Sequence, residues 1–186
     1  MRIAVSGTHC VGKSTLIEEF LRRHPNFIHE PEPYEVLVED YGEEFSAVPN
    51  VNDFQQQLQF NIERLQFHNP GDRVIYERCP ADFLAYILAL SRSETNSDVS
   101  LVRSTVEIVS SAVENLNLIL YLPLKESDSP PDDVEYPALR RQVDAYLADI
   151  LLADEFDIFS RGNVAIVEAT GSTMQRLQTL EQAINR

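Results

Sequence analysis

A short segment framed by two glycines constrains this chain more than any other feature. Residues 7–15 read Gly-Thr-His-Cys-Val-Gly-Lys-Ser-Thr, which fits the pattern G-x-x-x-x-G-K-S. Residues 2–6 form a short apolar, β-branched run that predicts a buried strand, and residues 16–22 predict a helix. Strand, glycine loop and helix together are the setting in which this pattern binds phosphate.

The chemistry of such a loop explains its residue types. Successive backbone N–H groups point inward at an anion, and Gly7 and Gly12 allow backbone angles that a Cβ would obstruct. The helix that follows directs the positive end of its dipole at the same anion. We expect Lys13 to contact the outer phosphates and the Ser14 hydroxyl to bind Mg²⁺. The sequence therefore predicts a polyphosphate and Mg²⁺, bound by Gly7, Thr8, His9, Cys10, Val11, Gly12, Lys13, Ser14 and Thr15.

Composition limits the partners of this loop. The 186 residues, of which 44% are hydrophobic, suit a single domain over residues 1–186. The net charge of −15 disfavours nucleic acid as a partner, because an acidic surface repels the phosphodiester backbone. No apolar run has the length of a membrane span, and the first strand begins at once, so we expect neither a membrane partner nor a signal peptide. Two cysteines, Cys10 and Cys79, make no disulfide framework, which favours a cytoplasmic location.

Strand-like and helix-like runs alternate along the chain. Strands are expected at residues 2–6, 26–29, 73–77, 118–122 and 164–168, and helices at 14–24, 35–41, 53–68, 80–90, 101–115, 138–155 and 173–184. Two prolines within residues 30–34 predict an irregular segment there. The alternation indicates an α/β fold, with an open parallel sheet and helices on both faces. Ligands of such sheets bind beyond the carboxyl ends of the strands.

Charged residues follow two more strands at that same edge of the sheet. Glu30 ends the second expected strand, and Glu77 and Arg78 end the third. A carboxylate beside a phosphate loop can bind Mg²⁺ or take a proton from a hydroxyl group, and a guanidinium can bind phosphate oxygens. Each residue alone would also suit the surface at a strand end. Their place beside the loop favours a role in function.

Taken together, these motifs resemble those of the P-loop nucleoside and nucleotide kinases. The order of the loop, Glu30-Pro31 and Glu77-Arg78-Cys79 is similar to that in deoxynucleoside kinases and thymidylate kinases. Residues 77–86 also resemble small AAA-type, kinase-like ATPases related to nicotinamide riboside kinase domains. The resemblance implies a three-layer P-loop NTPase fold with a five-stranded parallel sheet in the order 2-3-1-4-5. It also implies a Mg²⁺·ATP-dependent phosphotransferase that acts on a small nucleoside, nucleotide or riboside-like acceptor.

The resemblance assigns roles by position. Glu30 is similar in place to the base that accepts the proton of the acceptor hydroxyl, Glu77 to the acid associated with the metal, and Arg78 to an arginine that binds phosphate. The loop of Thr170, Gly171 and Ser172 corresponds to the one beside the adenine of ATP. An ordinary turn in which Ser172 caps the last helix is compatible with that role.

Three further residues are candidates for contacts with the acceptor. Tyr34 could stack on an acceptor ring or simply be packed. Gln57 and Arg64 are seven residues apart and so share one face of a helix rich in amide side chains. A solvated polar face is the alternative reading of that pair.

The segment expected to form a lid, residues 123–141, departs from the pattern of these kinases. The family closes an arginine-rich segment over the transferred phosphate, whereas Lys125 here stands among five acidic residues. Arg140 and Arg141, at the start of the next helix, are the candidates for the phosphate clamp, and a salt bridge within the helix is the alternative.

The acidic lid leaves open a second function, that of a nucleotide-binding regulatory ATPase or switch with weak or no kinase activity. The Asn-Lys-x-Asp motif of GTPases is missing, because the only lysine besides Lys13 is Lys125 in Leu-Lys-Glu. The family also suggests a homodimer, formed through the apolar helices that follow the third strand.

Overall fold

The computed structural model describes residues 1–91, 99–125, 135–160 and 162–185. Within these ranges five strands form one parallel sheet in the order β2-β3-β1-β4-β5. The strands are β1 Arg2–Ser6, β2 Ile28–Glu30, β3 Val74–Glu77, β4 Leu118–Tyr121 and β5 Ala165–Glu168. This order confirms the predicted α/β fold and its 2-3-1-4-5 sheet.

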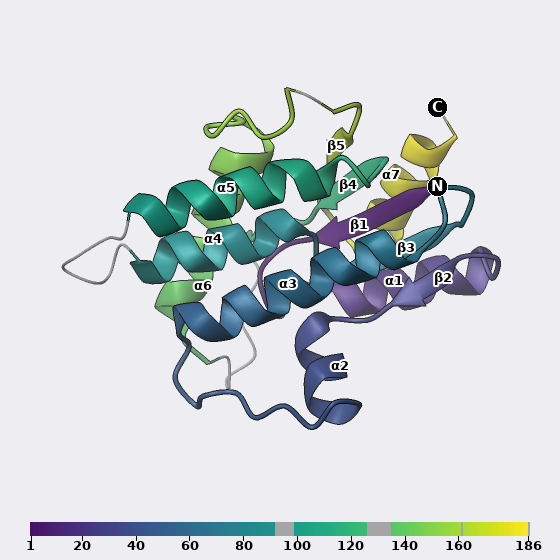
Figure 1. Ribbon diagram of the computed structural model, residues 1–186. Helices are drawn as coiled ribbons and strands as arrows, with labels where there is room; N and C mark the ends of the chain where they lie inside the picture. Colours follow the sequence, from purple (N-terminus) through teal and green to yellow (C-terminus); the bar gives the residue numbers. More distant parts are fainter. Residues whose placement is uncertain (92–98, 126–134, 161, 186) are drawn as a thin grey trace.

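Helices cover both faces of the sheet, so the fold has the three predicted layers (Figure 1). In the described ranges they are α1 Lys13–Arg23, α2 Pro33–Glu39, α3 Val51–Phe67, α4 Pro80–Ser91, α5 Val99–Val113, α6 Pro137–Leu151 and α7 Thr173–Ile184. The helices α1 and α7 lie on one face, and α3, α4, α5 and α6 lie on the other. Helix α2 stands apart from the sheet, next to α3 (Figure 1). None of the helices in these ranges has the length and apolar character needed to cross a membrane.

One hydrophobic cluster lies on each face of the sheet. Ile3 and Val5 of β1 pack with α1 and α7, whereas Ala4 packs with the cluster around α4. Side chains alternate between the faces of a strand, and because both faces are covered, β1 is apolar throughout its middle. The predicted core position of α4 is confirmed, since the helix is buried against α3, α5 and α6.

This burial bears on the suggested homodimer. Helix α4 offers no free face to a second subunit, because it lies beneath three other helices. Helix α5, also among the helices named for the interface, is more exposed, and Ile108 on it is 49% exposed. A homodimer stays a prediction, with α5 as the accessible part of the suggested interface.

The register of the sheet brings the charged strand ends level with the phosphate loop. Val5 is paired with Glu77, and Ser6 is paired with Tyr121. The backbone N–H of Arg78 donates to the carbonyl of Val5 at 3.0 Å, which extends the ladder to the first residue after β3. Glu77 and Arg78 are therefore held beside the residues that begin the loop.

Several of the expected element boundaries differ from the observed ones, and the differences at α2 and α6 have physical reasons. Pro33 begins α2 instead of prolonging an irregular segment, because the fixed φ of proline suits the first residue of a helix. Helix α6 ends at Leu151, four residues early. Beyond it, Asp154 adopts a φ of 48°, and its carboxylate accepts the N–H of Ile158 at 2.7 Å, which holds the chain in a turn. Residues 126–134 of the expected lid lie outside the described residues.

The position of α4 predicts a large effect of truncation. Phe83 is fully buried, and we expect Phe83→Ala to lower the free energy of unfolding by about 3–5 kcal/mol, through lost burial and the cavity left behind. Phe67, which is 77% exposed, is the matched control, and Phe67→Ala should change the same quantity by less than about 0.5 kcal/mol. Urea unfolding measures both. Equal losses would contradict the placement of α4 at the centre of the core.

Candidate active site

The phosphate loop connects β1 to α1, and its two glycines occupy positions that other residues would strain. Gly7 has a φ of 150° and Gly12 has a φ of 93°. A Cβ on Gly7 would lie 2.7 Å from the carbonyl oxygen of Leu122, which is closer than packed atoms approach. Both positions agree with the role predicted for glycine in this loop.

Each carbonyl oxygen from residue 7 to residue 11 accepts a hydrogen bond from a cationic side chain. The pairs are Arg78 Nη1 to Gly7 at 3.1 Å, Lys13 Nζ to Thr8 at 3.1 Å, Arg140 Nε to His9 at 2.9 Å, Arg140 Nη2 to Cys10 at 3.1 Å and Arg176 Nη1 to Val11 at 2.7 Å. Because cations bind these carbonyls, such a loop can turn its other N–H groups toward an anion; the Gly7 N–H is the exception, since it donates to Asp82 at 2.9 Å. The loop is thus shaped by guanidinium groups from three parts of the chain.

The two predicted clamp residues have different surroundings. Arg140 is 3% exposed, and its guanidinium binds the loop carbonyls directly. Arg141 is exposed to solvent on the next position of α6. The structure therefore brings Arg140, and not Arg141, to the phosphate loop.

Arg176 was missed by the sequence reasoning. It lies in the first turn of α7 and is 8% exposed, and α7 packs beside α1. The sequence around Arg176 does not indicate its contact with the Val11 carbonyl, because that contact depends on the packing of α7 against α1.

Two oxygen atoms suited to Mg²⁺ converge at the start of α1. The Ser14 hydroxyl donates to Glu77 Oε1 at 2.9 Å, and Lys13 Nζ lies 3.9 Å from the same oxygen. The described residues contain no group of three or more His, Cys, Asp or Glu that could hold a metal ion alone. One hydroxyl and one carboxylate fit Mg²⁺, which takes its other ligands from phosphate and water.

Arg78 links the phosphate loop to the first residues after β2. Its Nε donates to Glu32 Oε1 at 2.6 Å, its backbone has a φ of 75°, and its guanidinium lies 5.3 Å from the ring centre of Tyr86. Burial by itself would raise the pKa of Glu32, but Arg78 and Lys13 outweigh burial and lower this pKa to about 2. Glu32 is therefore ionised at any pH near neutrality.

Asp82 holds the turn between β3 and α4. It is fully buried, and its two carboxylate oxygens accept the N–H groups of Gly7 at 2.9 Å and Cys79 at 2.8 Å. Arg78 Nη1 lies 3.7 Å from Asp82 Oδ1. Burial raises the pKa of the Cys79 thiol well above its usual value, so this residue is a packed, protonated thiol. The sequence indicated no role for Asp82, because an acid in the first turn of a helix is common.

A cavity of about 480 Å³ lies beside the phosphate loop. His9 and Cys10 of the loop line it on one side, together with Arg78. Its other walls come from α2, α3, α4, residues 45–49 and the start of α6, and five aromatic side chains stand among them: Tyr34, Phe45, Phe54, Tyr86 and Tyr136. We call it the aromatic cavity.

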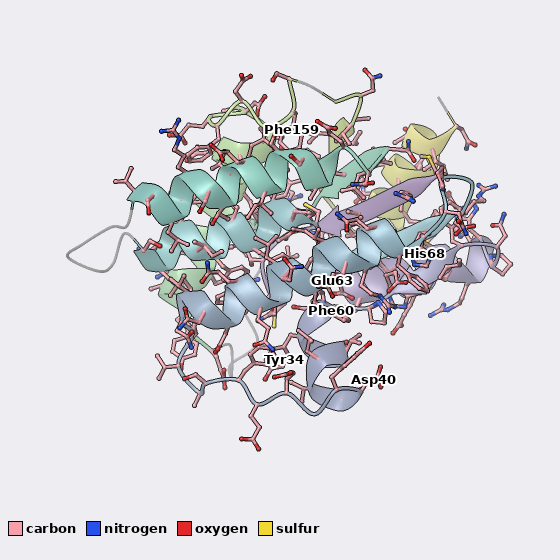
Figure 2. All side chains as sticks on the ribbon, in the orientation of Figure 1. Tyr34, Asp40, Phe60, Glu63, His68 and Phe159 are labelled. Atoms are coloured by element: carbon pink, nitrogen blue, oxygen red, sulfur yellow. The ribbon has the colours of Figure 1, made fainter. Side chains whose placement is uncertain are left out.

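Four of the five aromatic side chains of this cavity form two stacked pairs. The rings of Tyr34 and Phe45 have centres 5.1 Å apart, and those of Phe54 and Tyr86 have centres 4.3 Å apart. Tyr34 lies between α2 and the first half of α3 (Figure 2). Gln57, which is 5% exposed, also lines the cavity. Tyr34 and Gln57, two of the predicted acceptor contacts, are thus brought together here.

Glu30 and Arg64 lie elsewhere and do not line the aromatic cavity. The Glu30 carboxylate is 4% exposed and is bound by Arg64 and by His68 Nε2. Arg64 is two turns beyond Gln57, about 10 Å along α3, and Figure 2 shows His68 farther still, at the C-terminal end of that helix. Of the two glutamates that precede a proline, Glu32 is the one that lines the cavity, and sequence reasoning missed it although it repeats the Glu-Pro pattern of Glu30-Pro31.

The turn before α7 has the predicted cap. The Ser172 hydroxyl accepts the N–H of Gln175 at 3.4 Å, and the Gln175 side chain accepts the N–H of Ser172 at 2.8 Å, which makes a capping box. Gly171 has a φ of 95°, which favours glycine. Contact of Thr170, Gly171 and Ser172 with adenine stays a prediction.

The sheet order and the phosphate loop define a P-loop NTPase fold, and comparison with solved structures shows that nucleoside and nucleotide kinases have this fold too. Thymidylate kinase from Ehrlichia chaffeensis superimposes with a TM-score of 0.63 at 14% identity, over 100% of this chain and 98% of that one. Deoxyadenosine kinase from M. mycoides with bound dATP gives 0.66 at 13% identity and covers 100% of both chains. The NadR protein in complex with NR gives 0.66 at 17% identity, over 99% of this chain and 50% of that one. At such identities the likeness shows the fold.

The family follows from a separate comparison. The model of the AAA domain family matches residues 2–171, so this chain belongs to that family. The search of curated proteins found no match.

The contact of Arg140 with the loop predicts an effect on nucleotide binding. We expect Arg140→Met to weaken Mg²⁺·ATP binding about 10-fold or more, because two hydrogen bonds from a charged group hold the His9 and Cys10 carbonyls. Isothermal titration with a non-hydrolysable ATP analogue measures this. The control is Arg141→Met on the exposed neighbour, which should bind as the unchanged protein does. Equal weakening in both variants would show that the two arginines act together on the nucleotide.

Proposed function

We propose that this protein is a Mg²⁺·ATP-dependent kinase that phosphorylates a small acceptor bound in the aromatic cavity. One observation carries the proposal: the cavity and the phosphate loop share Arg78, His9 and Cys10 as lining or contact residues. A ligand in the cavity would therefore lie next to a phosphate bound by the loop. The P-loop kinase-like fold and the similarity to nucleoside and nucleotide kinases support this reading.

In this proposal the nucleotide side of the site has three parts. The backbone of residues 7–15 and Lys13 bind the phosphates, and Ser14 with Glu77 would hold Mg²⁺. The metal ion supplies positive charge to the phosphate oxygens when it is bound. The turn of Thr170, Gly171 and Ser172 would lie beside the adenine.

The acceptor side is built around Glu32 and Arg78. In the reaction the acceptor oxygen forms a bond to the γ-phosphorus, while the bond from that phosphorus to the β–γ bridging oxygen breaks and its electron pair leaves with ADP. The hydroxyl proton passes to Glu32 and from there to water. With a pKa of about 2, Glu32 is a weak base, but the transition state of phosphoryl transfer needs orientation of the hydroxyl more than early proton removal. Arg78 stabilises charge on the moving group.

This assignment moves one role from Glu30 to Glu32. Arg64 and His68 both bind the Glu30 carboxylate, and these contacts connect the end of β2 to the end of α3. Glu32 lies between Arg78 and the aromatic cavity. We therefore assign the acceptor hydroxyl to Glu32, with Tyr34 and Gln57 as contacts to the rest of the acceptor.

A regulatory ATPase or switch is the second candidate. It is favoured by the charge of residues 123–137, where Lys125 stands among five acids, since such a segment repels ATP. ADP release that depends on an added small acceptor supports the kinase. ADP release that depends only on a protein partner supports the switch.

The metal site predicts a separation of binding from turnover. We expect Glu77→Gln to lower turnover at least about 100-fold, because the metal loses a carboxylate, while ADP still binds in the absence of Mg²⁺. Coupled ADP-release assays and titration calorimetry measure the two. Glu63→Gln on the exposed face of α3 is the matched control (Figure 2). Normal turnover in Glu77→Gln would exclude the proposed metal site.

Substitution of Glu30 and of Glu32, each of which precedes a proline, should have different effects on turnover and stability. Glu32→Gln should lower kcat by about 10²–10⁴-fold with little change in nucleotide binding, as for loss of a group that receives a proton. Glu30→Gln should instead lower the melting temperature, because it disturbs a buried ion pair, and should leave kcat of the folded protein within a few fold. If Glu30→Gln loses turnover and Glu32→Gln keeps it, the roles are reversed.

A further inference from the structure

The part of the chain that surrounds most of the aromatic cavity is rich in acidic residues and poor in basic ones. Residues 24–63, which form β2, α2, residues 40–50 and most of α3, contain nine Asp or Glu and no Lys or Arg. Residues 135–139, at the start of α6, also contain no Lys or Arg. These described segments of the cavity wall therefore supply negative charge and no positive charge.

The aromatic cavity reflects this composition. Three carboxylate residues line it, Glu32, Asp53 and Glu135, and Arg78 is the one described lining residue with a fixed positive charge. Burial lowers the pKa of His9, so this residue is neutral near pH 7. The cavity thus holds an excess of negative charge.

Two of the three guanidinium nitrogens of Arg78 are already bonded, and in the proposed function its charge acts on the transferred phosphoryl group. Its Nε is bonded to Glu32 at 2.6 Å, its Nη1 is bonded to the Gly7 carbonyl at 3.1 Å, and the same nitrogen lies 3.7 Å from Asp82. Asp53, in contrast, accepts only neutral donors among its described contacts, the Ser46 N–H at 3.0 Å and the Asn50 amide at 2.7 Å. An anionic group in the cavity would face the Asp53 charge with no free cation beside it.

The remaining walls suit a flat ring. The stacked pairs Tyr34–Phe45 and Phe54–Tyr86 both line the cavity, and aromatic faces bind planar groups and also cations. The buried Gln57 side chain offers one donor and one acceptor group to the edge of such a ring.

We infer that the acceptor is an unphosphorylated alcohol with an aromatic ring, neutral or positively charged, and that the cavity excludes acceptors that already carry a phosphate. The inference rests on the proposed kinase function and narrows its acceptor class. The transferred phosphoryl group goes to a hydroxyl oxygen, the bond to ADP breaks, and the hydroxyl proton leaves by way of Glu32. A nucleoside or a ring-charged riboside meets this description, whereas a nucleoside monophosphate does not.

Binding to the full chain tests the inference while the phosphate loop is filled by Mg²⁺ and a non-hydrolysable ATP analogue, so that a ligand phosphate cannot enter the loop. The probes are deoxyadenosine, thymidine and nicotinamide riboside, each compared with its own 5′-monophosphate. We expect at least one unphosphorylated probe to bind about 10-fold or more tightly than its monophosphate at low salt. The difference should shrink as salt is added, since it arises from repulsion between charges. Tighter binding of nicotinamide riboside would indicate a cationic ring, and tighter binding of the nucleosides a neutral one.

Two substitutions locate the source of the selectivity. Asp53→Asn removes a charge from the cavity and should narrow the difference between each probe and its monophosphate by at least about 3-fold. Asp40→Asn removes a charge at the end of α2, at an exposed position outside the cavity, and should leave the difference unchanged (Figure 2). The salt dependence of the unchanged protein provides the same test if Asp53→Asn proves unstable.

The outcomes separate this inference from the proposed function. Monophosphates that bind as tightly as the unphosphorylated probes, and that are phosphorylated, would overturn the inference and leave the kinase assignment intact. Unphosphorylated probes that bind as expected, with no release of ADP from ATP, would support the acceptor class and overturn the kinase assignment. Binding of neither kind of probe would overturn both.

Discussion

The site depends on cationic side chains that bind the outward carbonyl groups of the phosphate loop. Arg78 follows β3, Arg140 begins α6 and Arg176 begins α7, so three separate parts of the chain meet at residues 7–11. A hydrogen bond from a charged donor is stronger in a buried setting, where water does not compete. The loop therefore takes its shape from the completed fold, and local sequence contributes mainly the glycines that permit it.

The sheet order and the arrangement of the phosphate loop beside Glu77 could be predicted from the sequence. The motif of residues 7–15 and its flanking strand and helix are contiguous, and the register that pairs Val5 with Glu77 follows from two parallel strands that start level. The Ser14 hydroxyl accordingly lies against the Glu77 carboxylate, as the pattern implied. Local spacing suffices here, because each contact joins residues at the ends of neighbouring strands.

The residues that line the aromatic cavity could not be predicted in the same way. Glu30 and Glu32 are two residues apart, and each precedes a proline, so nothing local decides which of them faces the cavity. The decision comes from α3, whose Arg64 and His68 bind Glu30 and thereby leave Glu32 to Arg78. The rotation and axial position of a helix depend on tertiary packing, which the spacing of polar residues does not reveal. The same reason explains why the contact of Arg140 with the loop carbonyls was beyond the reach of the sequence.

The Glu32–Arg78 pair is where the two halves meet. It joins an acidic cavity to a loop that is surrounded by positive charge, and the left-handed backbone of Arg78, with a φ of 75°, is a conformation that costs a non-glycine residue free energy. Buried ion pairs contribute little net stability, since desolvation offsets their attraction. The pair instead fixes the orientation of two side chains: the Glu32 carboxylate lines the aromatic cavity, and the Arg78 guanidinium binds the phosphate loop.

The origin of the cavity walls has an evolutionary consequence. Phe45 and Ala47 come from the connection between α2 and α3, Tyr136 comes from the segment before α6, and the Tyr136 hydroxyl donates to the Ala47 carbonyl at 2.7 Å. Both segments lie outside the sheet, where insertions and replacements are tolerated best. Their exchange could give a new acceptor preference without moving Ser14 or Glu77, whose positions are set by strand register. Under the proposed kinase function, relatives of this chain could therefore differ in their acceptors while keeping the residues that would hold the nucleotide.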